Sequence, residues 1–399
     1  MRILVHDFGG YAFALRLSLT LAERGHEVCH AFCASLITTP PGIACDSHSG
    51  PPGLTIARLH LKQPLDKYSF FKRWRQEREY GRLICDQLAA FEPDVVLSGN
   101  APLDAQKVLI ATCRKRGISF VYWLQDLVGI ATYRLLRRRL FGVGWAVGIY
   151  YRHLETSLLR TSDHVVVITR DFEAPLQTRG VPTHCVTAIE NWADLATLPT
   201  KPKNNPWSRA RGLHDKTCLL YAGTLSMKHD PGLLVRLAER FRENNTVRIV
   251  VITQGSGADY LAERRKSLGL NNLILIEYQP TSTFPDILGA ADVLVAVLEP
   301  DAAEYSVPSK ILTYLCAARP LLLAVSSTNL AARIVEKNGL GIVVAPHDMD
   351  AFYGAAEDLV ARADVRREMG CRARAYAETV FNPESIADHF TRVFEIAAA

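Results

Sequence analysis

The sequence predicts an α/β protein with two domains, each built on a parallel β-sheet. Strand-like apolar runs alternate with segments of helical spacing as far as residue 195. A polar, proline-containing stretch without periodicity follows at 197–216, and the same alternation then restarts. Strands that alternate with helices pair in parallel through right-handed crossovers. A chain of 399 residues is also too long for one ordinary core.

The first half contains short apolar runs, several of them rich in β-branched and aromatic residues, and each is a predicted strand: 2–8, 27–33, 54–61, 94–99, 118–126, 163–169 and 185–190. Between the first two, Leu15, Leu19 and Ala22 follow helical spacing, and Gly25 suits the end of that helix. We assign 1–195 to an N-terminal Rossmann-like domain and 196–216 to a linker.

The second half repeats the pattern, with predicted strands at 217–223, 247–255, 273–279, 292–298, 320–325 and 340–346. Predicted helices cover 231–243, 257–268, 283–289, 308–318 and 329–338, and only helices follow residue 349. We assign 217–380 to a second Rossmann-like domain and 381–399 to a C-terminal helix, for which packing against the first domain is one arrangement. The architecture predicts a cleft between the domains, with ligands at the carboxyl ends of strands.

Composition narrows the class of protein. Hydrophobic residues make up 48% and the net charge is +5, which gives no indication of a nucleic-acid partner. The nine cysteines show no pairing pattern, and Cys29, Cys185 and Cys218 lie in apolar runs, so we expect buried free thiols in a reducing compartment. The chain starts in a strand rather than a signal peptide, and its longest apolar candidate, 140–151, is too short to cross a bilayer. We therefore expect a cytoplasmic protein.

Metal chemistry is not expected, because the histidines show no ligand spacing such as HxxxH. The glycines after the first strand, Gly9 and Gly10, do not form GxGxxG, and no acidic residue ends the second strand. This argues against a nicotinamide or flavin dehydrogenase, although the turn still allows a ligand phosphate or sugar to approach.

In the second domain, polar or glycine-containing loops follow the predicted strands. Gly223 and Thr224 come after 217–223, and Lys228 adds a charge suited to phosphate; a solvated surface lysine is the alternative. Gly255 belongs to a GxG, a spacing that more often marks only a tight turn. Tyr278 offers contact to a flat base, whereas a plain capping loop with Thr283 is the alternative.

The stretch "EPDAAEYSVPSKILTYLCAARP" (299–320) combines acidic and basic groups. Glu304 can accept hydrogen bonds from two sugar hydroxyls. Ser309 and Lys310 lie in the first predicted helical turn, where donors suit a phosphate, and Thr313 follows one turn later. An ordinary charged loop with a capped helix is the alternative.

In the first domain, Asn100, Gln125 and Asp126 follow the fourth and fifth predicted strands. They are the polar candidates for the cleft on this side. For Asp126, capping of the next helix is an equally open interpretation.

These motifs together resemble the GT-B glycosyltransferases of family 4, the retaining nucleotide-sugar group, and most closely its bacterial branch for surface polysaccharides of the colanic-acid and O-antigen type. The segments that carry the resemblance are "FGGYAFALRLSLTLAERGHEV", "SDHVVVITRDFEAPLQTRGVPTHCVTAIENWAD" (162–194), "LLYAGTLSMKHDPGLLVRLAE" (219–239) and "YSVPSKILTYLCAARPLLLAV" (305–325).

The resemblance implies that the second domain binds a nucleotide diphosphate-sugar, used as a co-substrate without other cofactors, and that the first binds the acceptor. The implied donor-binding residues are Gly9, Gly10, Gly223, Thr224, Lys228, Gly255, Tyr278, Glu304, Ser309, Lys310 and Thr313. Asn100, Gln125 and Asp126 would bind the acceptor, and the catalytic candidates are Asp126, Lys228 and Glu304. The family pattern has two glutamates eight residues apart. Here Thr313 occupies the second position, and Glu304 is the nearest acidic residue to the first.

In such a reaction negative charge develops on the departing diphosphate, and Lys228 and Lys310 would stabilise it without a metal. The resemblance also implies a polyprenyl-diphosphate-linked sugar as acceptor. Two basic–aromatic stretches, 68–83 and 133–155, suit a membrane surface through Phe71, Trp74, Arg137, Arg138 and Arg139. Core-packed helices with a solvated face are the alternative. We expect peripheral binding at the inner face of the cell membrane.

Two other functions are compatible with the sequence: a nucleotide-sugar epimerase of the same architecture and a non-catalytic sugar- or nucleotide-binding protein. An epimerase changes the donor sugar without an acceptor, and a binding protein changes neither.

Overall fold

The computed structural model describes residues 1–36, 50–66, 69–139, 142–225, 230–298 and 309–399. The chain forms two compact units, Met1–Asn191 with Pro383–Ala399, and Trp192–Asn382. Each unit contains a parallel sheet with helices, so the predicted class of two Rossmann-like α/β units with C-terminal helices is confirmed. We describe each unit by itself.

In the described part of the first unit, seven strands form one parallel sheet in the order β3-β2-β1-β4-β5-β6-β7. Their bounds are β1 Arg2–Asp7, β2 Glu27–Cys33, β3 Leu54–Leu59, β4 Val95–Gly99, β5 Ser119–Leu124, β6 His164–Val167 and β7 Val186–Ala188. The central strands are apolar on both faces, as expected where helices cover both sides of a sheet. The strand order reverses between β1 and β4, which makes their carboxyl ends the expected ligand position.

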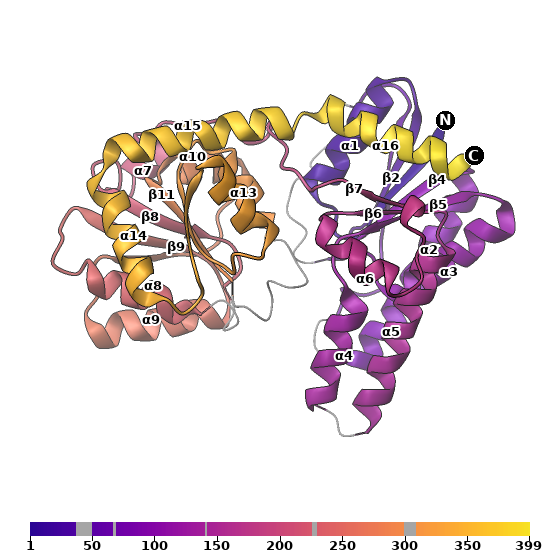
Figure 1. Cartoon of the computed structure of the whole chain (residues 1–399), viewed down its shortest axis with the longest axis horizontal. Coiled ribbons are helices and arrows are strands. Elements are labelled where there is room, and N and C mark those ends of the chain that lie inside the picture. The colour runs from indigo at the N-terminus through magenta and orange to yellow at the C-terminus, as the bar shows by residue number, and fades with distance from the viewer. Residues whose placement is uncertain (37–49, 67–68, 140–141, 226–229, 299–308) are drawn as a thin grey trace. The chain divides into compact units, whose positions relative to one another are not determined.

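The helical elements of this unit are α1 Ala12–Glu23, α2 Phe70–Phe91, α3 Leu103–Arg116, α4 Val128–Arg139, α5 Val143–Thr161, η1 Arg170–Phe172, α6 Glu173–Gln177, η2 Thr183–Cys185 and α16 Pro383–Ala398. Figure 1 shows α4 and α5 side by side as a hairpin that extends from the sheet. The predicted C-terminal helix, α16, packs on α1, where Arg24 pairs with Glu384 (2.7 Å) and Asp388 (2.8 Å). Phe390 of α16 lies edge-on to the buried Trp123, with ring centroids 5.2 Å apart.

The described part of the second unit holds six parallel strands in the order β10-β9-β8-β11-β12-β13. The bounds are β8 Thr217–Ala222, β9 Val247–Ile252, β10 Leu273–Ile276, β11 Val293–Val297, β12 Leu321–Ala324 and β13 Gly341–Val344. The order reverses between β8 and β11, at the point equivalent to that in the first unit.

The helical elements here are α7 Pro206–Arg209, α8 Pro231–Arg240, α9 Ser256–Leu268, η4 Thr281–Thr283, α10 Phe284–Gly289, α12 Ser309–Leu315, α13 Leu330–Asn338, α14 Met349–Ala361 and α15 Ala363–Val380. Part of the predicted linker 196–216 is packed into this unit. Asn205 caps α7 and donates to the carbonyl oxygen of Asp286 (2.8 Å), and Trp207 and Leu213 are buried. The apolar surface of these two side chains favours packing over an open linker.

The buried free thiols predicted from composition are confirmed for Cys29 and Cys218. Cys185 differs, because it ends the short 3₁₀ turn η2 just before β7 and is only half-buried. In the part of the chain that the structure describes, no helix combines the length and the apolar character needed to span a bilayer.

Candidate donor and acceptor sites

Tyr314 lies at the point where the strand order of the second sheet reverses, between β8 and β11. Strand β11 pairs with β8 only at Leu219 and Leu220, so the two strands separate towards their carboxyl ends. The hydroxyl of Tyr314, from α12, takes over there: it accepts from the amide nitrogen of Ala222 (2.8 Å) and donates to the carbonyl oxygen of the same residue (3.0 Å). The N–H and C=O groups of Ala222 are therefore hydrogen-bonded, although β11 no longer pairs with β8 at this position.

Lys310 lies one helical turn before Tyr314 and points at this opening. Its ammonium donates to the hydroxyl of Tyr221 and lies 3.9 Å from the centroid of the Tyr221 ring. Gly223 has a φ of +134°, and a Cβ placed on it would lie 3.5 Å from Lys310 Nζ. Desolvation lowers the pKa of Lys310 to about 7. Among the described residues no carboxylate pairs with this ammonium, so the site holds a cation beside an open backbone, which suits an anionic ligand.

Thr224 and Tyr278 extend the same edge of the sheet. The hydroxyl groups of Thr224 and Tyr278 lie 3.1 Å apart, and the Tyr221 hydroxyl donates to the Thr224 carbonyl oxygen (2.8 Å). The Tyr278 side chain is 43% exposed, so its ring is available to a flat ligand group. Thr283 stands at the N-cap position of α10, but its side chain makes no capping hydrogen bond and donates instead to the carbonyl oxygen of Pro280 (2.7 Å).

In the GxG of this unit, Gly257 is needed for close packing. A Cβ on Gly257 would lie 2.1 Å from the carbonyl oxygen of Leu225, so only glycine allows α9 to begin so close to the loop after β8. Gly255, with a φ of +89°, precedes α9 and has open space where a Cβ would stand. Close packing therefore accounts for Gly257, while a contact of Gly255 with the donor stays a prediction.

Replacing Gly257 by Ala is expected to destabilise the second unit by about 2–4 kcal/mol, because the new methyl group must push helix and loop apart. Gly354→Ala is the matched control, since a Cβ there meets nothing within 4 Å inside α14. That change should be neutral or stabilise by up to about 1 kcal/mol. Chemical denaturation of both variants measures the difference, and equal stability of the two would contradict the packing argument.

The structure describes only some of the other predicted donor-binding residues. Ser309 is exposed at the start of α12, and Thr313, half-buried, lies three residues beyond Lys310 on the same helix. Lys228 and Glu304 lie outside the described residues. Sequence reasoning missed Tyr221 in this unit, although its place two residues before Gly223 was an available signal.

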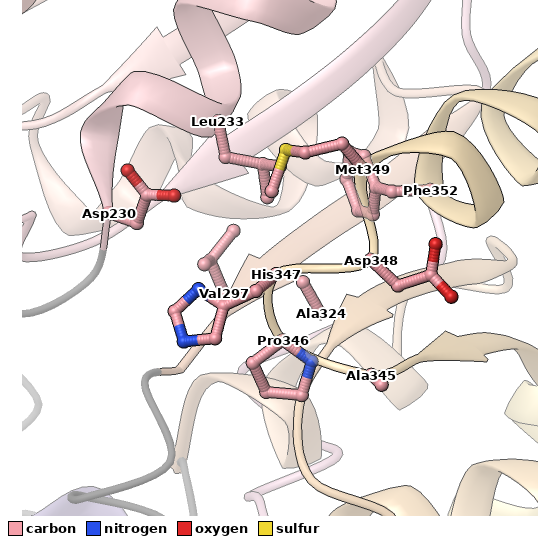
Figure 2. A pocket seen from close by; sticks show the side chains of 10 residues that line it. All are labelled: Asp230, Leu233, Val297, Ala324, Ala345, Pro346, His347, Asp348, Met349 and Phe352. Atoms are coloured by element: carbon pink, nitrogen blue, oxygen red, sulfur yellow. The ribbon is translucent and has the colours of Figure 1, made fainter.

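A small apolar cavity lies at the carboxyl ends of β11, β12 and β13, but it is too small to be a substrate pocket. Figure 2 shows its lining, with Leu233, Val297, Met349 and Phe352 among the side chains. Its volume of about 10 Å³ holds at most one water molecule.

The reversal point of the first unit is built around Asp7, at the end of β1. Its buried carboxylate accepts from Asn100 Nδ2 (2.8 Å) and from the amide of Tyr11, and the amides of Gly9 and Gly10 also bond it. Burial raises the pKa of Asp7 to about 6, and these hydrogen bonds act in the opposite direction. The Tyr11 ring covers Gly9: a Cβ there would lie 2.2 Å from Tyr11 Cε2, so a larger residue would displace this exposed ring. Sequence reasoning considered only the glycines here and missed Asp7.

Gln125 and Asp126 follow β5, as predicted. Gln125 is buried and accepts from Asn191 Nδ2 (2.5 Å). Strand-end reasoning also missed Asn191, which appeared only within "ENWAD". The Asp126 side chain is exposed, yet the protein around it raises its pKa to about 6 through partial desolvation. Burial raises the pKa of the Tyr11 hydroxyl, and the charges of Asp7 and Asp126 raise it further, so the two carboxyl groups lie near one ring.

The capping interpretation of Asp126 is not what the structure shows. The amide of Gly129, in the first turn of α4, donates to Glu155 Oε1 (2.7 Å) instead. Asp126 is therefore left available to a ligand on the exposed side of the turn.

The predicted membrane residues are only partly described. Phe71, at the start of α2, is 77% exposed, and Trp74 is half-buried beneath the guanidinium of Arg78, 4.8 Å from its ring centroid. Arg137, Arg138 and Arg139 end α4, and their side chains lie outside the described part of the structure.

Among the residues that the structure describes, no group of three or more His, Cys, Asp or Glu side chains is placed to hold a metal ion.

Comparison with known families identifies the class of protein. The model of the "Glycosyl transferase 4-like domain" matches residues 9–192, and that of the "Glycosyl transferases group 1" matches residues 216–362. The two matches follow one another along most of the chain, in the order of its two structural units. The chain belongs to the GT-B glycosyltransferases of family 4.

Individual relatives agree with this class. WcaI of Escherichia coli (strain K12), assigned as a colanic acid biosynthesis glycosyl transferase, is 23% identical over 253 residues, which are 62% of this chain and 61% of WcaI. Anabaena Alr3699/HepE, solved with UDP-glucose, has a similar fold with a TM-score of 0.71 at 14% identity, covering 99% of both chains. WaaG, a glycosyltransferase of lipopolysaccharide biosynthesis, gives a TM-score of 0.67 at 16% identity, with 98% of this chain and 100% of WaaG covered.

Proposed function

We propose that this protein is a retaining glycosyltransferase that moves a sugar from a nucleotide diphosphate-sugar to a lipid-linked glycan acceptor in bacterial surface polysaccharide synthesis. The observation that carries the donor half is the Lys310 ammonium beside Gly223 at the reversal point of the second sheet. A cation without a carboxylate partner among the described residues, next to an open backbone, suits a diphosphate. The relative assigned to colanic acid biosynthesis supports the polysaccharide context.

The chemistry follows from where charge develops. When the bond between the sugar and the diphosphate breaks, negative charge accumulates on the phosphate oxygens. Lys310, together with Lys228 as the second predicted cation, would stabilise that charge without a metal ion. Tyr221 holds the Lys310 ammonium in place, so little reorganisation accompanies the reaction.

On the acceptor side, Asp126 would accept a hydrogen bond from the attacking hydroxyl group and orient it. Retention then corresponds to attack on the face from which the diphosphate leaves, with a donor phosphate oxygen taking the proton. Gln125 and Asn100 lie at neighbouring strand ends and would complete the acceptor contacts.

A transfer assay tests the proposal. Radiolabelled UDP-, GDP- and ADP-sugars are mixed with synthetic polyprenyl-diphosphate-linked monosaccharides, and product formation, free nucleotide and the anomeric configuration are measured, with and without EDTA. We expect one donor class to give an α-linked product from an α-linked donor at an unchanged rate in EDTA. Inversion of configuration, or loss of activity in EDTA, would contradict the corresponding part of the proposal.

The same assay separates the two alternatives. Conversion of the donor sugar without an acceptor would identify an epimerase. Nucleotide binding with no product across the whole panel would favour a binding protein.

We further propose that the first unit binds the cytoplasmic face of the cell membrane through exposed aromatic residues on α2 and α5. Phe71 and Trp145 are 77% and 52% exposed, beside basic stretches. In flotation at low salt, the protein should bind vesicles with 30% phosphatidylglycerol and not vesicles of pure phosphatidylcholine. Phe71→Ser with Trp145→Ser should reduce binding about tenfold. Ile396→Ser, at a position 58% exposed on α16, is the control and should have no effect. Equal binding by all variants would contradict this surface.

A further inference from the structure

The turn that carries Asp126 is held from both ends. It joins β5 to α4 through residues 125–127, and Gly129 lies in the first turn of α4. Within the described chain, no hydrogen bond or ion pair fixes the Asp126 carboxylate itself, so its position depends on the residues on either side. Gln125 is bonded to Asn191, and the Gly129 amide is bonded to Glu155.

Glu155 is an unusual anchor because it is a completely buried carboxylate. Its Oε1 accepts from the Gly129 amide (2.7 Å), and its Oε2 lies 3.2 Å from Arg179 Nη1. A Cβ on Gly129 would lie 2.9 Å from Glu155 Oε2, so glycine is what allows this approach. The contact links α5 and the segment after α6 to the first turn of α4.

The energetics of this contact favour a role beyond stability. Burying a carboxylate has a desolvation penalty that one ion pair often fails to offset, and apolar side chains of similar size would serve stability equally well. A charged acceptor does, however, give the Gly129 amide a strong and directional hydrogen bond. The ionisable groups that act on Glu155 are Arg179 and, through space, Asp126; Glu155 in turn acts on Tyr122.

We propose that Glu155 is a positioning residue for sugar transfer: by fixing Gly129 it sets the orientation in which the turn presents Asp126 to the acceptor. The proposal rests on the proposed function, in which Asp126 orients the attacking hydroxyl. Arg179 neutralises the buried charge, and the Asn191–Gln125 bond holds the other end of the turn.

The test compares two variants. Glu155→Ala removes the bond to Gly129. Glu155→Gln combined with Arg179→Gln keeps an oxygen for the Gly129 amide and removes both charges together. Asp292→Asn is the matched control. Like Glu155, Asp292 pairs with a basic side chain, here Lys203, and accepts a hydrogen bond from a backbone amide, that of Cys218 (2.8 Å), but it belongs to the second unit.

Three quantities are measured well below each melting temperature: kcat for transfer per folded molecule, the dissociation constant for UDP, and hydrogen exchange of the peptide 124–132. Glu155→Ala should lower kcat at least tenfold and speed exchange of this peptide at least tenfold, with UDP affinity unchanged. The double variant should stay within about threefold of the original protein in both. Asp292→Asn should lower the melting temperature and leave kcat and this peptide unchanged.

A kcat within twofold of the original for Glu155→Ala would overturn the proposal, and so would equal loss in the double variant. If the unaltered protein transfers no sugar to any acceptor in the panel, it is the proposed function that fails. In that case exchange of 124–132 still decides whether Glu155 holds the turn: unchanged exchange in Glu155→Ala overturns it.

Discussion

Replacement of Lys310 by Met is expected to lower kcat/KM for the nucleotide-sugar donor about 10²–10³-fold, the usual effect of removing one group that stabilises developing charge. Methionine keeps most of the side-chain volume beside Tyr221 and Gly223, so the loss reports the charge rather than the packing. Steady-state rates with the labelled donor measure it. Lys337→Met, an exposed position on α13, is the control and should change nothing. A Lys310→Met rate within threefold of the original would remove this lysine from the donor site.

Lys310 also predicts a pH dependence of nucleotide binding. Its pKa in the free protein is lowered to about 7, so above pH 7 most molecules carry a neutral amine. A bound diphosphate favours the charged form, and binding must then take up a proton, which weakens affinity as the pH rises. We expect the UDP dissociation constant to increase about tenfold between pH 7 and pH 8.5. Calorimetry should show this increase in the original protein and its absence in Lys310→Met.

Asp126→Asn is expected to lower kcat for transfer about 10²–10³-fold while leaving UDP affinity unchanged, because the asparagine amide no longer presents a negative oxygen to the attacking hydroxyl. In the original protein the pKa of Asp126 is raised to about 6, so the carboxylate form is lost as the pH falls through 6. The transfer rate should therefore decrease about tenfold per unit below pH 6.

The control for Asp126 is Asp86→Asn, an exposed carboxylate on α2 of the same unit, which should retain full activity. An Asp126→Asn variant with an unchanged acidic limb in its pH–rate profile would show that another group titrates there. Asp7, whose pKa is also raised to about 6, would be the next candidate.

Most of the fold was predictable because each element carries its own signal. Every predicted strand is present within a few residues of its expected bounds, and α8, α9, α10, α12 and α13 match the predicted helices. The apolar runs of a parallel sheet are buried on both faces and stand out in the sequence. The segment 196–216 was harder, because the burial of Trp207 and Leu213 depends on partners such as α10, more than 70 residues later.

The candidate site was predictable where a residue directly follows its strand, as Gln125, Asp126 and Gly223 do, or lies in the first turn of the next helix, as Lys310 does. Asn191 and Glu155 were not predictable in this way, since they reach the turn after β5 from 66 and 26 residues away in the chain. The role of Tyr314 was not predicted: its hydroxyl replaces the missing strand pairing at Ala222.

The sequence by itself determined the class of protein: alternating strands and helices, two units, and strand-end residues suited to a diphosphate and a hydroxyl acceptor. The tertiary structure decided which of these side chains work together. Periodicity and turn residues are local properties and are read from consecutive positions. The hydrogen bonds that fix Asp7 and the Asp126 turn, and the desolvation that lowers the pKa of Lys310, depend on distances between remote segments, which only the folded chain sets.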